Sequence, residues 1–265
     1  MALIEAAMLA AASGADFSCP PLVDISQVWS RVNQRWLIIG EDHGTNEQPE
    51  IFLGVVCQAS AKRKVTVAVE QPASEQSAID AFVQSDGGSA ARARFLSGPI
   101  WRGSFKDGRS SQAYLRLFDQ LRLLRKAGRI TSVRAFQPAG ASGPGIFEEK
   151  MADELLRQSP PDSLVVVLVG SVHAMRTPVS FGGPAYLPMA GHLPRSKTMS
   201  VALRGAGGKQ WACQSPTDCG PFDVFQEGRP PAAGLTLNPG KDAAYSAIYG
   251  MNQPTSASPP QIPRS

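Results

Sequence analysis

The sequence lacks the features that mark several common classes of protein. No apolar stretch approaches the roughly 20 residues that a membrane-spanning helix needs. Basic residues are scattered, with no run longer than Lys62-Arg63-Lys64, and aromatic residues do not alternate with them. The net charge of +4 therefore does not predict a nucleic-acid surface, and we expect no nucleic-acid partner. Neither Cys-x-x-Cys nor Gly-x-Ser-x-Gly occurs, which argues against a zinc ribbon, a thioredoxin-type site and a serine hydrolase elbow.

Cysteine is also scarce, yet its four residues bear on the cellular compartment. Cys213 and Cys219 lie six positions apart in a stretch that suits a small disulfide-closed loop. Cys19 and Cys57 could form a second bridge, although their spacing does not establish it, and four unpaired thiols are the alternative. The even count favours an oxidising compartment, so we expect a periplasmic or secreted protein, with the cytoplasm as the alternative.

Residues 1–18 permit two interpretations. Positions 1–12 are rich in Ala, Leu and Met, and the Ser-Gly-Ala that follows has the small-x-small form of a signal-peptidase site. A basic start is absent and Glu5 interrupts the apolar run, which disfavours an export signal. The segment is thus either a signal-like remnant or a short N-terminal helix.

The remaining chain alternates short apolar segments with longer amphipathic ones. Strands are expected at 36–39, 65–69, 130–136, 164–169 and 198–203, and helices at 23–32, 48–63, 74–83, 114–127 and 147–156. Strands that are apolar throughout and separated by helices predict a parallel sheet covered on both faces. We therefore expect a single α/β domain over 19–250, with a mainly parallel central sheet flanked by helices and a Gly/Pro-rich C-terminal region. The composition of residues 251–265 predicts a disordered tail.

Two histidines and two glutamates follow the ends of three predicted strands. Glu41 and His43 come after the first strand, Glu70 closes the second, and His173 comes after the strand ending at Val169. Each of these histidines lies three residues after a glycine that ends its strand. In open parallel sheets ligands bind outside the carboxyl ends of the strands. A buried carboxylate such as Glu70 is costly unless it is paired, hydrogen-bonded or metal-bound, so we predict a catalytic site made of these four residues.

Further residues could bind the substrate. Arg102, Asp107 and Arg109 lie in a polar loop before the helix expected at 114–127. Either arginine could reach over the cleft to hold an anionic or carbonyl group, while helix capping by the same loop is the structural alternative. Glu47 either supports the start of a helix or faces the cleft.

These motifs resemble a known superfamily. Residues 40–47 (Gly-Glu-Asp-His-Gly-Thr-Asn-Glu), a strand ending in Glu70 and the later Gly-Ser-Val-His-Ala of 170–174 are similar to erythromycin-esterase-like proteins, ChaN-like haem-binding lipoproteins and TraB/Tiki metalloproteases. The esterase-like motif carries one more residue between its Glu and His than this sequence does. The paired Gly-x-x-His motifs are closer to the Tiki pattern, and the resemblance covers about residues 35–175.

The residues and the resemblance together suggest two classes of function. The first is hydrolysis of an ester, amide or peptide bond in a small-molecule or peptide substrate. Without a metal, His43 would be the general base, oriented by Glu41 or Glu70, and His173 or an arginine would stabilise the oxyanion. With a metal, His43, His173 and Glu70 would hold a divalent ion such as Zn, Mn or Fe. The second class, which the ChaN-like resemblance implies, is haem or metal binding without catalysis.

Overall fold

The computed structural model describes residues 17, 19–30, 33–140, 143–215, 217–224, 231–238 and 243–262. The signal-like segment predicted at 1–18 lies outside this part of the chain, apart from Phe17. Among the described residues, no helix is both long and apolar enough to cross a membrane.

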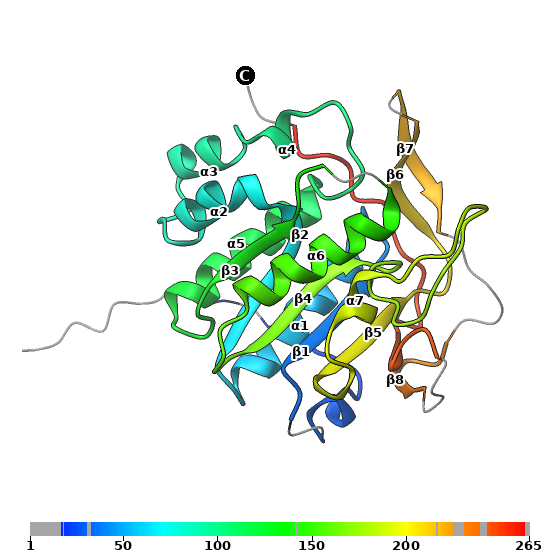
Figure 1. The fold of residues 1–265 in the computed structure, drawn as a ribbon. Coiled ribbons are helices and arrows are strands. Elements are labelled where there is room, and N and C mark those ends of the chain that lie inside the picture. Colours follow the sequence, from blue (N-terminus) through cyan, green and yellow to red (C-terminus); the bar gives the residue numbers. More distant parts are fainter. Residues whose placement is uncertain are drawn as a thin grey trace, which may run out of the picture.

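A seven-stranded sheet forms the centre of the molecule (Figure 1). In spatial order its strands are β3 (Val133–Gln137), β2 (Val65–Pro72), β4 (Leu164–Gly170), β1 (Trp36–Glu41), β5 (Thr198–Arg204), β9 (Ala247–Gly250) and β8 (Gly234–Leu237). All neighbours are parallel except β8, which runs antiparallel to β9. Every residue of β1 and β4 is buried, as expected of apolar strands covered on both faces. The predicted α/β fold with a mainly parallel sheet is confirmed.

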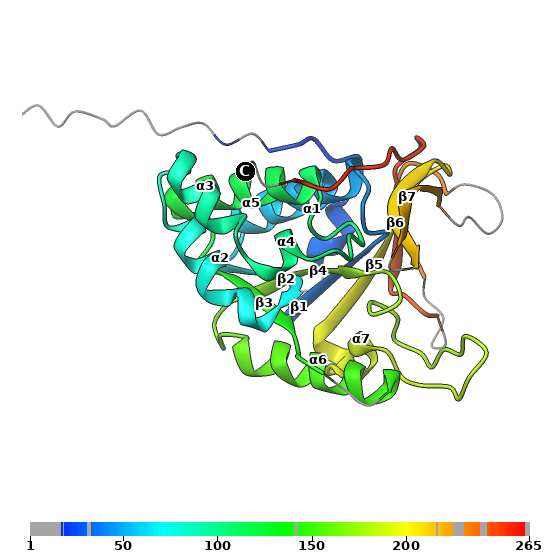
Figure 2. The same ribbon diagram turned by 90° about the horizontal axis from the view of Figure 1, so that it is seen from above.

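Helices cover both faces of the sheet (Figure 2). One face carries α1 (Glu47–Ser60), α2 (Gln76–Val83), α3 (Ser89–Phe95), α4 (Pro99–Arg102) and α5 (Gln112–Lys126), and the other carries α6 (Pro144–Gln158) and α7 (Met189–His192). Short 3-10 turns lie at η1 (Ser26–Ser30), η2 (Ala73–Glu75) and η3 (Arg195–Lys197). Alternate residues of β1 enter the two cores: Leu37 and Ile39 pack toward α1 and α5, and Trp36 and Ile38 toward α6.

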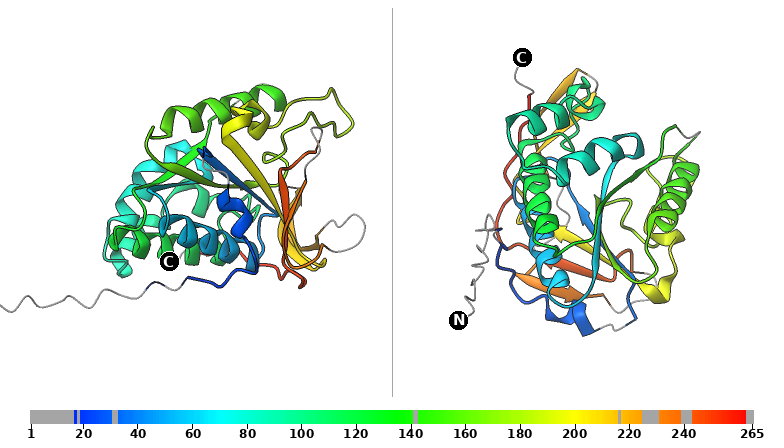
Figure 3. Two further views of the ribbon diagram at one scale, coloured as in Figure 1. Left: turned by 90° about the horizontal axis from the view of Figure 1, so that it is seen from below. Right: turned by 90° about the vertical axis from the view of Figure 1, so that its left-hand side faces the viewer.

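A separate hairpin, β6 (Lys209–Ser215) and β7 (Asp218–Asp223), stands beside the sheet in both views of Figure 3. Cys213 and Cys219 face each other across it and form a disulfide. A second disulfide joins Cys19 to Cys57 on α1. The pairing that the sequence favours, Cys213–Cys219, and the one that it leaves open, Cys19–Cys57, are therefore both present.

Two predictions from the sequence need correction. In place of the helix expected at 23–32, the structure has only the short turn η1, and residues 31–32 lie outside the described part of the chain. The tail predicted to be disordered is ordered over 252–262, because its backbone bonds to two loops: Ser258 N donates to Gly44 O, and Pro259 O accepts from Gln112 N. Residues 263–265 are not described.

Candidate active site

The predicted residues gather at the carboxyl edge of three adjacent strands. The order β2-β4-β1 places the ends of these strands side by side, and Glu41 lies directly opposite Gly170 in the register. Glu41 and Glu70 are almost fully buried, while the side chains of His43 and His173 keep 20% and 22% of their surface exposed. The carboxylates are thus fixed in the protein, and the imidazoles are the groups a ligand can reach.

Glu70 is the centre of the cluster. Its Oε2 accepts a hydrogen bond of 2.7 Å from Gly170 N and lies 3.3 Å from His43 Nε2. Its Oε1 lies 3.1 Å from Arg109 Nη1 and 3.7 Å from His173 Nε2. Burial alone would raise the pKa of Glu70, but His43, His173 and Arg109 together hold that pKa well below its ordinary value. Glu70 is therefore a carboxylate shared by Arg109 and by the imidazoles of His43 and His173.

His43 is held on its other side by Glu41. The distance from His43 Nδ1 to Glu41 Oε1 is 2.8 Å, and the hydroxyl of Tyr114 donates to the same oxygen. Burial lowers the pKa of His43, but the negative charges of Glu70 and Glu41 outweigh it and raise this pKa to about 10. The free protein therefore carries His43 as an imidazolium at neutral pH.

His173 forms a second imidazole–carboxylate pair. Its Nδ1 lies 2.7 Å from Glu148 Oε1, and Met189 N donates to Glu148 Oε2 at 2.7 Å. Burial lowers the pKa of His173, whereas Glu70 and Glu148 raise it, and the net shift is upward. Both histidines thus present Nε2 toward the single carboxylate of Glu70.

The predicted substrate-binding residues divide into two groups. Arg109 lies in the cluster, where it donates hydrogen bonds to Glu70 and to Gln137 Oε1 (2.7 Å). Its Nε also donates a hydrogen bond of 2.9 Å to Asp107 Oδ2. Arg102 is exposed at the end of α4, outside these contacts. Glu47 binds Ser256 of the C-terminal segment through both carboxylate oxygens. The structure therefore brings Arg109 and Asp107, but not Arg102 or Glu47, to the histidines.

Sequence reasoning missed Tyr114, Glu148 and Gln137. Glu148 carried a usable signal: on the predicted helix it stands at helical spacing from Met151, Ala152 and Leu155, all of which face the core. A glutamate on an apolar helix face needs a partner, which here is His173.

The side chains of this cluster that could bind a metal ion already bind one another. In the described part of the chain, no three His, Cys, Asp or Glu side chains are arranged so that they could hold a metal ion. Both oxygens of Glu70 have N–H partners, and one of these belongs to Arg109, a permanent cation that would repel a metal ion bound at the same carboxylate. The residues as placed do not fit the predicted three-ligand metal site.

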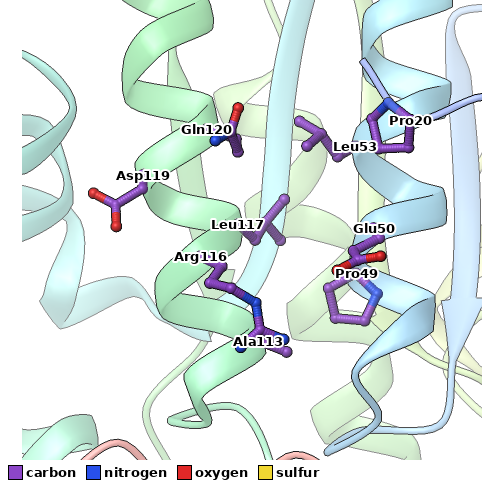
Figure 4. A pocket seen from close by; sticks show the side chains of 9 residues that line it. All are labelled: Pro20, Pro49, Glu50, Leu53, Ala113, Arg116, Leu117, Asp119 and Gln120. Atoms are coloured by element: carbon purple, nitrogen blue, oxygen red, sulfur yellow. The ribbon is translucent and has the colours of Figure 1, made fainter. Parts of the chain in front are cut away.

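A separate cavity of about 410 Å³ lies between α1 and α5 (Figure 4). It is lined by Pro20, Pro49, Glu50, Leu53, Ala113, Arg116, Leu117, Asp119 and Gln120. None of the predicted catalytic residues lines this cavity, so it is distinct from the histidine cluster.

The fold and the site define a class: a mainly parallel α/β protein with two carboxylate-held imidazoles at the carboxyl edge of its sheet. A point mutant of the erythromycin esterase EreC, solved in its open conformation, has a similar structure, with a TM-score of 0.62 and 13% identity over 91% of this chain and 95% of that one. A Bacillus cereus protein is also similar, with a TM-score of 0.55 and 11% identity over 89% of this chain and 92% of that one. No protein-family profile and no curated protein matches the sequence. At these identities the similarity shows the fold alone: this chain has a fold similar to that of an erythromycin esterase.

Proposed function

We propose that this protein hydrolyses an ester bond in a small-molecule substrate without a metal ion, using His43 as the general base. The observation that carries the proposal is the Glu41–His43 pair, which engages Nδ1 and leaves Nε2, 3.3 Å from Glu70 Oε2, as the nitrogen of His43 that can exchange a proton. The esterase among the structural neighbours supports an ester as the bond that is cleaved.

The residues fit each step of such a reaction. Glu41 accepts a hydrogen bond from His43 Nδ1–H and so keeps that proton on Nδ1. Neutral His43 can then take a proton from water at Nε2 as the water oxygen bonds to the ester carbonyl carbon. When the tetrahedral intermediate collapses, its bond to the alkoxy oxygen breaks, and His43 returns the proton to that oxygen. The products are a carboxylic acid and an alcohol.

Arg109 and His173 are placed to stabilise the negative oxygen of the intermediate. Four hydrogen bonds from Arg109 to Asp107, Glu70 and Gln137 leave one of its five N–H groups unused. His173 Nε2 lies 3.7 Å from Glu70, too far for a good hydrogen bond, so this nitrogen can donate a hydrogen bond to a ligand.

The raised pKa of His43 makes the proposed rate depend on pH. The base form of His43 is scarce at pH 7 and increases toward pH 10, so kcat/KM should rise over this interval. The two disulfides favour an oxidising compartment, and we propose a periplasmic or secreted location.

The test is a panel of p-nitrophenyl esters, an anilide, a peptide and erythromycin, assayed from pH 6 to 10 before and after dialysis against a chelator. We expect ester turnover that survives the chelator and rises with pH. Loss of turnover on chelation, with recovery on adding Zn²⁺ or Mn²⁺, would favour the metal version. A Soret band in the purified protein together with no turnover would favour haem binding.

A further inference from the structure

The C-terminal segment, residues 252–262, lies against the loops that carry the site. Figure 2 shows it in red, running from the β6–β7 hairpin across the side of the molecule that bears α1 and α5. Isolated β-bridges join Thr255 to Gly208, Ala257 to Thr45 and Pro260 to Ser111. The segment therefore connects the hairpin, the turn between β1 and α1, and the start of α5.

Its first set of contacts holds the turn that follows His43. Ser258 N donates to Gly44 O at 2.7 Å, and Asn46 N donates to Ser256 O at 3.0 Å. Gly44 O also accepts a hydrogen bond from Trp211 N of the hairpin at 2.9 Å. The residue next to His43 is thus bound from two sides.

The second set of contacts holds the start of α5. Ser258 Oγ accepts a hydrogen bond from Ala113 N at 2.9 Å, which satisfies one of the N–H groups that the first turn of a helix leaves unpaired. Gln112 N donates to Pro259 O at 2.9 Å, and Gln261 N donates to Ser110 O at 2.8 Å. Tyr114, whose hydroxyl binds Glu41, directly follows Ala113.

The two loops also touch each other. Gly108 has a positive φ of 99°, and a Cβ added there would lie 2.3 Å from Gly44 N. Gly44 has a φ of 76°, and its Cβ would lie 2.0 Å from Trp211 O. Only glycine fits at these two positions, so no side chain of either residue can hold the junction. The hydrogen bonds from Ser258 and Trp211 to Gly44 hold it instead.

We propose that Ser258 is a positioning residue that sets His43 and Tyr114 relative to Glu41, by joining the turn after His43 to the start of α5. The effect on turnover rests on the proposed function, whereas the effect on geometry does not. Ser258 is fully buried and uses its backbone N–H for one loop and its hydroxyl for the other. Loss of the hydroxyl leaves Ala113 N without this partner and weakens the connection between Ser258 and the start of α5.

The test compares Ser258→Ala with Ser159→Ala. Ser159 is a matched control because its Oγ also accepts a hydrogen bond from a buried N–H, the indole of Trp36, at the opposite edge of the sheet. We expect Ser258→Ala to lower kcat about tenfold on the best ester with KM changed less than about twofold, because misplacing a catalytic group slows the chemical step. Ser159→Ala should lose stability in thermal unfolding but keep its kcat.

A second readout does not depend on turnover. The chain has three histidines, so the ¹⁵N resonances of the His43 ring can be assigned by substitution. We expect these resonances to shift in Ser258→Ala and not in Ser159→Ala. If no substrate is hydrolysed but the resonances shift, the positioning role stands and the hydrolase proposal fails. If kcat and resonances are unchanged in folded Ser258→Ala, the positioning role is wrong.

Asn46→Ala keeps the proposal testable if Ser258→Ala does not fold. It removes the hydrogen bonds from Asn46 Nδ2 to Ser256 Oγ and Ala257 O, both of 3.1 Å, and the exposed one that Asn46 Oδ1 accepts from Arg116 at 2.8 Å. We expect a smaller fall in kcat and a smaller shift of the His43 resonances. An Asn46→Ala protein with both values at wild type would overturn the proposal.

Discussion

The two imidazole–carboxylate pairs of the site look alike but are built differently. In the first, Glu41 and His43 are two residues apart, and Glu41 Oε1 is shared by His43 and Tyr114. The buried Oε2 of Glu41 has no hydrogen-bond partner among the described residues. In the second, Glu148 and His173 are 25 residues apart and each carboxylate oxygen has its own N–H partner. The first pair is local and electrostatically unbalanced, whereas the second is long-range and fully satisfied.

This difference suggests separate roles. Burial raises the pKa of Glu41, and its hydrogen bonds to His43 and Tyr114 only partly oppose that shift. A carboxylate in this state accepts a strong hydrogen bond from His43 Nδ1–H, which suits an imidazole that gains and loses a proton at Nε2. The satisfied Glu148 suits an imidazole that stays protonated and stabilises charge.

The largest expected effect comes from removing each imidazole in turn. On the best ester, His43→Asn should lower kcat about 1000-fold, because the general base is lost, and His173→Asn about 100-fold, because only charge stabilisation is lost. His192→Asn is the control, since His192 ends α7 and its Nε2 contacts the carbonyl of Leu187 rather than the carboxylates of the site. Steady-state kinetics decide the comparison, and a His43→Asn protein that keeps more than a tenth of wild-type kcat would remove His43 from the mechanism.

The second effect comes from Glu70, which both pairs share. Glu70→Gln removes the carboxylate charge that raises the pKa of His43 most strongly, so that pKa should fall and the rise of kcat/KM should move to lower pH by about one unit or more. Folding should also weaken, by about 1–3 kcal/mol, because Arg109 loses one of its two carboxylate partners and keeps only Asp107.

Stability should respond to pH in the same variant. The pKa of His43 is raised from 6.5 to about 10 in the folded protein, so its contribution is complete below pH 6.5 and is lost as pH rises toward 10. Denaturant unfolding at pH 7 and pH 10 should therefore show a loss of stability in the wild type and a smaller loss in Glu70→Gln. An equal loss in both proteins would mean that Glu70 does not control His43.

The two pairs also show what a sequence can predict. Strands such as 36–39 and 164–169 were identifiable because an apolar run that is too short for a helix and ends in glycine favours a buried strand. The position of ligands at the carboxyl ends of parallel strands then grouped His43, Glu70 and His173. Glu41 could be paired with His43 because both belong to one turn. Glu148 could not be assigned to His173, since their contact exists only after α6 packs beside β4.

The C-terminal segment failed prediction for a related reason. Composition measures whether a segment can bury enough apolar surface to order itself, and residues 252–262 cannot. Their order comes instead from backbone hydrogen bonds to Gly44, Gln112 and other loop residues that the rest of the fold has already placed. That information lies in the partner loops rather than in the segment.

The smallest expected effect tests Tyr114, which has no counterpart in the second pair. Tyr114→Phe removes the hydroxyl that donates to Glu41 but keeps the ring in the core, so we expect about 1 kcal/mol of lost stability and a three- to tenfold lower kcat. Tyr249→Phe is the matched control: it loses one hydrogen bond, from Val23 N, on the distant strand β9, and should lose similar stability with unchanged kcat. In the second pair, the corresponding hydrogen bond to Glu148 comes from the backbone N–H of Met189. A side-chain substitution can therefore remove this contact from the first pair but not from the second. If both variants kept wild-type kcat, the shared oxygen of Glu41 would matter to folding alone, and the difference between the pairs would have no catalytic meaning.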